Sequence, residues 1–389
     1  MSGFDLSADA SAAALRGVRA ASAASADVYA RAVWSVLTEP GDRVAGALIA
    51  HLGAAPALRH ALSGAAAESP VSPRDMATAR ERWMPRADPA LVATALERAR
   101  RSGTRLVVPG DAEWPTRLDD LGEHAPHALW MQGTPGEWNV TPAVALVGAR
   151  AATGYGEHVA AELSADLAGE GVTVVSGAAY GIDGAAHRAA LSAGGRTVAL
   201  LAGGVDRPYP TGHTDLLRRI ASHGVVAGET PCGTAPSKWR FLARNRLIAA
   251  LSDATIIVEA GVRSGSLNTA AHAASLGRAL GAVPGPVTSA ASAGAHRILR
   301  EFDGVCITGA DDVRELLGLT VSAPVATGSR TSELTRLLDA ASTRVATPAL
   351  ELARRSGLAP AEVEALLGLA ALSGDLLADG DGWRRAPTR

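Results

Sequence analysis

Four basic side chains and two aromatic rings lie between residues 238 and 246 of the sequence. They are Lys238, Trp239, Arg240, Phe241, Arg244 and Arg246. Cationic side chains bind phosphates and aromatic rings stack on flat groups, so this segment forms a basic, stacking-capable surface. Lys238 is also the only lysine of the chain. Asn245 lies within the same segment and adds a polar amide.

Several apolar runs end in small or polar residues that suit a phosphate. The run TIIVEA is followed by the turn Ser264, Gly265 and Ser266 and then by a helical pattern, an arrangement that presents backbone N–H groups to anions. Other runs end in Gly148, Ala149, Arg150 and Thr153, in Ser176 and Gly177, and in Gly203 and Gly204. We expect all these endings to face one crevice.

The candidate catalytic groups are Asp183, His187, Glu229, Glu259 and His272. Asp183 and His187 are four residues apart on an expected helix, so a structural pair is favoured over a catalytic one. The first strand-to-helix turn reads GARAATGYG, which lacks the GxGxxG spacing, and the chain lacks GxxxxGK[ST]. We therefore expect no cofactor, no metal site and no enzymatic activity.

Composition restricts any nucleic-acid site to a local patch, because 39 acidic residues outnumber 37 basic ones. Two cysteines cannot form a disulfide framework, and the N-terminus lacks the pattern of a signal peptide. No apolar run approaches the ~20 residues of a membrane span. These features predict a cytoplasmic protein without a membrane anchor.

The hydrophobic patterns predict four regions. Residues 1–103 show helical periodicity, with Trp34 expected in the core. Residues 104–320 alternate short apolar runs (PAVALVGA, VTVVSGA, TVALLAGG, GVVAGET, TIIVEAG and ALGAVPG) with helical segments, which predicts an α/β fold with a doubly wound, mostly parallel sheet. TRLVVPG and HALWMQG are expected as edge or accessory strands. Residues 321–330 read as a linker.

Residues 331–389 predict three helices and a hairpin, the pattern of a winged helix-turn-helix. The expected recognition helix, residues 360–373, carries Glu362 and Glu364 and no base. Because carboxylates repel phosphates, a protein-contact or regulatory role is favoured over the reading of duplex DNA.

Three long motifs resemble those of the DprA/Smf family of bacterial DNA-processing proteins: SGAAYGIDGAAH, KWRFLARNRLIAAL and EAGVRSGSLNTA. The resemblance implies an extended Rossmann-like fold and a helical N-terminal domain similar to SAM or helix-hairpin-helix modules. It also implies a homodimer that binds single-stranded DNA without hydrolysis and loads the RecA recombinase during recombination or natural transformation. Arg150 is then the pocket arginine, Lys238 the DNA-contacting lysine and Phe241 the stacking ring. Arg244 to Arg246 and Ser264 to Ser266 complete the pocket.

Two other classes of function remain open at this point. The first is an enzyme that cleaves the N-glycosidic or phosphate bond of a nucleotide. Rossmann-like enzymes of that kind are expected to carry a PGGxGTxxE-like loop where this chain reads AGVRSGSLNTA, which disfavours this class. A sensor of small nucleotides is the other.

Overall fold

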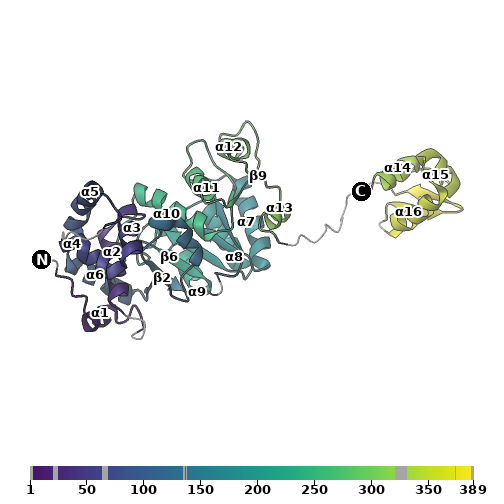
Figure 1. The fold of residues 1–389 in the computed structure, drawn as a ribbon. Helices are drawn as coiled ribbons and strands as arrows, with labels where there is room; N and C mark the ends of the chain where they lie inside the picture. Colours follow the sequence, from purple (N-terminus) through teal and green to yellow (C-terminus); the bar gives the residue numbers. More distant parts are fainter. Residues whose placement is uncertain are drawn as a thin grey trace. The chain divides into compact units, whose positions relative to one another are not determined.

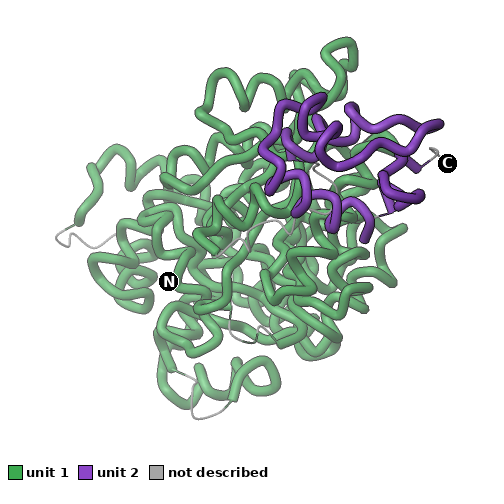
Figure 2. Tube along the Cα trace, turned by 90° about the vertical axis from the view of Figure 1, so that its right-hand side faces the viewer, with its two compact units in different colours: residues 1–320 green, residues 321–389 purple. Residues whose placement is uncertain are grey.

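The computed structural model describes residues 3–20, 25–63, 69–134, 136, 138–319, 331–372 and 374–386. The chain forms two compact units, residues 1–320 and residues 321–389, which Figure 2 shows in different colours. The predicted linker, residues 321–330, lies outside the described residues. Among the described residues, no helix is long and apolar enough to cross a bilayer.

The first part of the larger unit is helical, as predicted, and lies at the purple end of the ribbon in Figure 1. Its helices are α1 (Ala8–Leu15), α2 (Ala26–Leu37), α3 (Arg43–Leu52), α4 (Ala54–Ser63), α5 (Pro73–Trp83), the 3-10 helix η2 (Met84–Arg86) and α6 (Pro89–Arg101). Ser25 and Asp42 begin α2 and α3 by accepting hydrogen bonds from first-turn N–H groups. Trp34 is fully buried, with its ring centroid 5.1 Å from that of Trp83. The expectation that Trp34 belongs to the core is confirmed.

A nine-stranded sheet follows, in the order β1-β2-β6-β5-β4-β3-β7-β8-β9. The strands are β1 (Arg105–Val107), β2 (Leu129–Gly133), β3 (Ala143–Val147), β4 (Thr173–Ser176), β5 (Thr197–Leu201), β6 (Val225–Gly228), β7 (Ala254–Ile257), β8 (Ala279–Ala282) and β9 (Val305–Cys306). The pairs from β6 to β9 are parallel, whereas β1 and β2 are antiparallel at one end. The six apolar runs are therefore strands β3 to β8, and the two shorter runs are the accessory strands, as predicted.

Helices cover both faces of this sheet. They are α7 (Gly154–Gly169), α8 (Ile182–Ser192), α9 (Thr214–His223), α10 (Lys238–Leu251), α11 (Ser266–Ser275), α12 (Ala293–Glu301) and α13 (Ala310–Leu316), while the 3-10 segments η3 (Thr116–His124) and η4 (Thr211–His213) lie in connections. Alternate residues of β3 enter different cores: Ala145 packs in the core that holds α10 and α11, and Val144 in the core that holds α7 and α8. Burial on both faces explains why the strand sequences are continuously apolar.

The helical region and the sheet share a third core. Trp34 and Leu48 pack in it together with Trp130 of β2 and Leu201 of β5. Residues 1–320 accordingly form one compact unit. The predicted domain boundary between residues 103 and 104 stays a prediction.

The smaller unit contains α14 (Ser332–Ala340), α15 (Ala349–Ser356), α16 (Pro360–Leu372) and an antiparallel hairpin of β10 (Leu376–Asp379) and β11 (Gly382–Arg385). Leu337, Leu352 and Leu367 form its own core. Gly357 ends α15 in the left-handed conformation, which glycine adopts without strain. The three helices and the hairpin lie where the sequence predicts them. Assignment of this unit to the winged-helix class stays a prediction.

Candidate nucleic-acid-binding site

The strand order reverses at β3, which has β4 on one side and β7 on the other. In open parallel sheets ligands bind outside the carboxyl ends of the strands at such a switch point. Here the loops that follow β3 and β7 border a cavity of about 860 Å³. The first turn of α10 and the N-terminus of α11 complete its wall.

Ten of the residues predicted for DNA binding line this cavity. They are Gly148, Ala149, Arg150, Lys238, Phe241, Arg244, Asn245, Ser264, Gly265 and Ser266. They come from two loops, after β3 and β7, and from two helices, α10 and α11, that are distant in sequence, so the fold assembles the site.

The first turn of α10 places Lys238 and Phe241 at the cavity. Ser237 caps this helix by accepting a hydrogen bond from the Arg240 N–H at 3.3 Å. Lys238 and Phe241 are three residues apart and therefore share a helix face. Trp239 faces elsewhere, is 61% exposed and does not line the cavity.

Aromatic and cationic groups stack around the ring of Phe241. The guanidinium carbon of Arg150 lies 4.6 Å from the ring centroid, and that of Arg244 lies 5.9 Å from it. The ring of Tyr209 approaches from another side, with centroids 5.6 Å apart and an interplanar angle of 52°. Such surfaces bind the flat face of any base, because stacking does not depend on base identity.

The cavity carries an excess of positive charge. Arg150, Lys238 and Arg263 line it, and none of them makes an ion pair with another described residue. Asp183 is the one acid among the lining residues and is buried. Burial raises the pKa of the Asp183 carboxyl, and its Oδ2 accepts hydrogen bonds from the N–H groups of Gly177 and Ala179 at 3.1 and 3.3 Å. The accessible charge of the cavity is therefore cationic.

Arg244 lies at the floor of the cavity and is itself buried. Its guanidinium donates to the carbonyl oxygens of Gly177, at 2.8 Å, and Leu200. Burial lowers the pKa of Arg244 to about 10, which still leaves the side chain charged at neutral pH. A Cβ atom at Gly177 would lie 2.4 Å from the nitrogens of this guanidinium, so a larger residue there would displace the Arg244 side chain. Arg244 supports the cavity and adds positive potential to it.

The turn between β7 and α11 is held by polar side chains. The Asn245 amide donates to the Gly265 carbonyl at 3.1 Å, and the hydroxyls of Ser264 and Ser266 lie 2.7 Å apart. The N-terminus of α11 therefore opens into the cavity beside that of α10, and both helix dipoles favour an anion there.

Four other predicted site residues do not line the cavity. Thr153 caps α7 and donates its hydroxyl to Glu259 at 2.9 Å, while Ser176 is buried and donates to the Leu146 carbonyl at 2.7 Å. Gly177 accepts from Arg244 as described. Arg246 is buried and pairs with Glu229 at 2.8 Å. All four make structural contacts outside the cavity lining, and the prediction that they face the crevice is wrong.

Gly203 and Gly204 also lie outside this cavity. The Gly204 N–H donates to the Thr234 carbonyl at 2.9 Å, and Gly203 packs against Pro236. The prediction that every strand ending faces one crevice is therefore wrong for β5, because the loop after β6 covers its end.

Tyr209 and Arg263 line the cavity and were not singled out from the sequence. Arg263 lies inside the motif EAGVRSGSLNTA, so a signal was present. Tyr209 lies in an aperiodic loop between β5 and α9, and its proximity to Phe241 arises only from the tertiary fold.

Two of the groups considered for catalysis, His187 and Asp183, make structural hydrogen bonds. The Nδ1 atom of His187 lies 2.7 Å from the Thr197 hydroxyl, and burial lowers the His187 pKa to about 3. Asp183 bonds to backbone N–H groups instead of His187, so the expected mutual support of these two residues is wrong. Within the described residues, no group of three His, Cys, Asp or Glu side chains could hold a metal ion.

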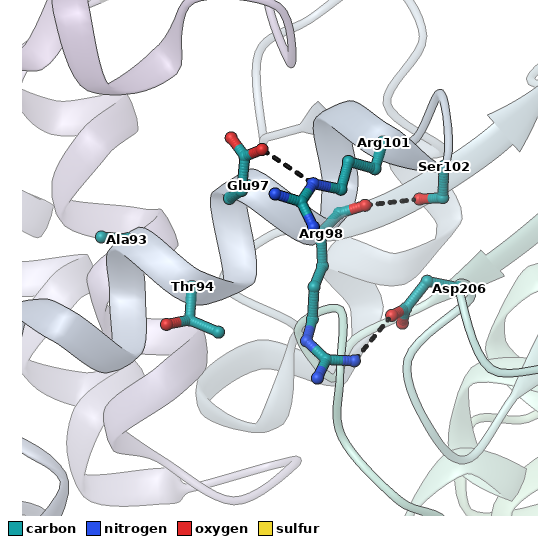
Figure 3. Close-up of a pocket in the computed structure, with 7 residues that line it drawn as sticks. All are labelled: Ala93, Thr94, Glu97, Arg98, Arg101, Ser102 and Asp206. Atoms are coloured by element: carbon teal, nitrogen blue, oxygen red, sulfur yellow. Dashed lines mark hydrogen bonds and ion pairs between the residues drawn. The ribbon is translucent and has the colours of Figure 1, made fainter.

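A second cavity, about 770 Å³, lies beside α6 (Figure 3). Its two arginines already have acidic partners: Arg98 lies 3.7 Å from Asp206, and Arg101 lies 2.9 Å from Glu97. With its arginines paired in this way, the cavity offers phosphates less positive charge than the one at the switch point.

The protein thus has a mixed α/β fold with a large, mostly parallel sheet and a cationic, aromatic-lined cavity at the switch point. The model of the family DNA recombination-mediator protein A matches residues 105–318. The chain belongs to this family, also called DprA or Smf.

Similar proteins and structures agree with this assignment. A candidate DNA processing protein DprA of Mycobacterium tuberculosis is 49% identical over 298 residues, which cover 72% of this chain and 76% of that protein. The crystal structure of DprA from Streptococcus pneumoniae matches with a TM-score of 0.60 and 28% identity, over 76% of this chain and 99% of that one. DprA from Helicobacter pylori, whose structure concerns a mode of single-stranded DNA binding, matches with a TM-score of 0.50 and 30% identity, over 56% of this chain and 97% of that one.

Proposed function

We propose that this protein is a non-catalytic, cytoplasmic recombination mediator that binds single-stranded DNA in the switch-point cavity and loads RecA onto it. The observation that carries the DNA-binding part is that Arg150, Lys238 and Arg263 line one cavity together with the Phe241 ring, over which the Arg150 guanidinium lies. Cations for the backbone and a ring for a base meet there at the N-termini of two helices.

The geometry favours a single strand over a duplex. A base can reach the Phe241 ring only if its face is free, and in a duplex both faces are stacked on neighbouring bases. The Helicobacter pylori relative, which is described as binding single-stranded DNA, supports this choice. RecA loading and a homodimeric state rest on the family resemblance of the three motifs.

A binding titration tests this function. We expect a fluorescently labelled oligonucleotide to bind without strong sequence preference, a duplex of the same length to bind much less tightly, and free nucleotides to compete poorly. Affinity for the single strand should fall steeply as salt rises, because phosphate contacts release counterions. Tight binding of free nucleotides alone would instead identify a nucleotide sensor or enzyme.

Lys238→Ala is expected to weaken single-stranded DNA binding by about 1 to 2 kcal/mol, which overlaps the roughly 1.5 to 3 kcal/mol of a hydrogen bond to a charged group. Lys238 is exposed at the start of α10, so the melting temperature should change little. Lys238→Arg should retain most of the affinity because it keeps the charge. The measurement is anisotropy beside thermal melting, and an unchanged affinity of the alanine variant would exclude Lys238 from the site.

A further inference from the structure

Helix α16 of the C-terminal unit is apolar on two opposite faces. Val363, Leu367 and Ala370 are buried in the core of the unit. The opposite face is exposed and consists of Ala361, Ala365, Gly368, Leu369 and Leu372. At 100° per residue these five positions span an arc of about 100°. Leu369 is 55% exposed and Leu372 is 90% exposed. A helix that is apolar all round is normally covered on both sides.

Two carboxylates border this exposed stripe. Glu362 lies at one edge and Glu364 at the other, both exposed. Glu362 also accepts a hydrogen bond from the Ala359 N–H at 3.1 Å, which holds its carboxylate at the start of the helix. Residues 360–372 contain no base. The surface is therefore an apolar stripe with a negative rim.

The negative charge of the rim determines which kind of partner can bind to the stripe. Phosphates of duplex DNA would meet Glu362 and Glu364, and repulsion disfavours that contact. A second copy of α16 offers no base: a parallel pair would place carboxylate against carboxylate, and an antiparallel pair would place carboxylates beside leucines. A helix with basic residues at both edges of an apolar stripe complements the surface in charge and in polarity.

We propose that this face of α16 binds an amphipathic helix of a partner protein. The apolar stripe of that helix packs on Leu369 and Leu372, and its Lys or Arg side chains pair with Glu362 and Glu364. The described residues that line the switch-point cavity all belong to the larger unit, so this proposal and the DNA-binding proposal rest on different residues.

The test uses the full-length protein and two synthetic helical peptides. One peptide carries leucines at helical spacing with lysines along both edges, and the other carries glutamates in place of the lysines. Fluorescence anisotropy should show that the lysine peptide binds at least about tenfold more tightly than the glutamate peptide. Leu372→Glu should weaken binding of the lysine peptide by at least about tenfold. Glu364→Lys, which leaves the Glu362 cap intact, should narrow or reverse the preference between the peptides.

Leu350→Glu is the matched control, because Leu350 is 72% exposed on another helix, α15. It should leave peptide affinity within about twofold of the parent value. Equal binding of both peptides, or an equal loss in the Leu350 and Leu372 variants, would overturn the proposal. It would also be wrong if Leu372→Glu abolished duplex binding or dissociated a dimer in analytical ultracentrifugation, since the occupant would then be DNA or a second copy.

Discussion

Arg246→Ala is expected to lower the free energy of unfolding by about 3 to 5 kcal/mol, the cost of leaving one member of a buried ion pair without its partner. Arg246 and Glu229 are nearly inaccessible, with 6% and 9% of their side chains exposed. The Arg246 guanidinium lies 2.8 and 2.9 Å from the two Glu229 carboxylate oxygens and also donates to the His124 carbonyl. Without it, the Glu229 charge would remain buried beside β6.

Arg240→Ala in the same helix is the matched control. Arg240 pairs with Glu39 at 2.8 Å, but these side chains are 21% and 33% exposed. Solvent screens such a pair, so the expected loss is about 0 to 1 kcal/mol. Urea denaturation of both variants measures the difference. Equal stability of the two variants would show that the buried pair between Arg246 and Glu229 does not exist in solution.

Phe241→Ala is expected to weaken single-stranded DNA binding by about 1 to 3 kcal/mol, the range for removal of one base-stacking ring. Phe241 lines the cavity, with the Arg150 guanidinium 4.6 Å from its ring centroid and the Tyr209 ring 5.6 Å from it. Its loss removes the surface on which a base would stack, while Lys238 and Arg263 stay in place. Phe241→Tyr should retain most of the affinity.

Trp239→Ala separates stacking in the cavity from a general effect of aromatic residues. Trp239 is larger and more exposed than Phe241, yet it lies outside the cavity. We expect its variant to bind within about twofold of the parent protein. Anisotropy titrations of the two variants decide the matter, and a greater loss for Trp239→Ala would move the DNA path to the outer face of α10.

The sequence predicts the sheet well because its strands are buried on both faces. Continuous apolar runs such as TVALL of β5 are typical of strands in a parallel sheet. The rule that ligands bind at the carboxyl ends of parallel strands then predicts that the loops after β3 and β7 border the site. The same sequence does not separate Arg244 from Arg246. Two residues apart on a helix, these side chains point in directions about 160° apart, Arg244 toward the cavity floor and Arg246 toward Glu229.

The spacing of residues in the sequence does not reveal which distant side chains form ion pairs or hydrogen bonds in the folded protein. Nothing local links Arg246 to Glu229, which follows β6, or Thr153 to Glu259, which follows β7. Both acids were considered as catalytic candidates, and both hold a structural partner. Tyr209 enters the cavity through a loop without periodicity, so only the three-dimensional structure places it beside Phe241.

The salt dependence of single-stranded DNA binding tests the central claim most directly. The parent protein is compared with a variant in which Arg150, Lys238 and Arg263 are all alanine. A variant of Arg98 and Arg101, which line the cavity beside α6, serves as the control. Each phosphate contact contributes about 0.7 to the slope of log K against log salt for a single strand, so loss of three contacts should make the slope shallower by about 2. The control should keep the parent slope. An unchanged slope in the triple variant would contradict the placement of DNA in the switch-point cavity.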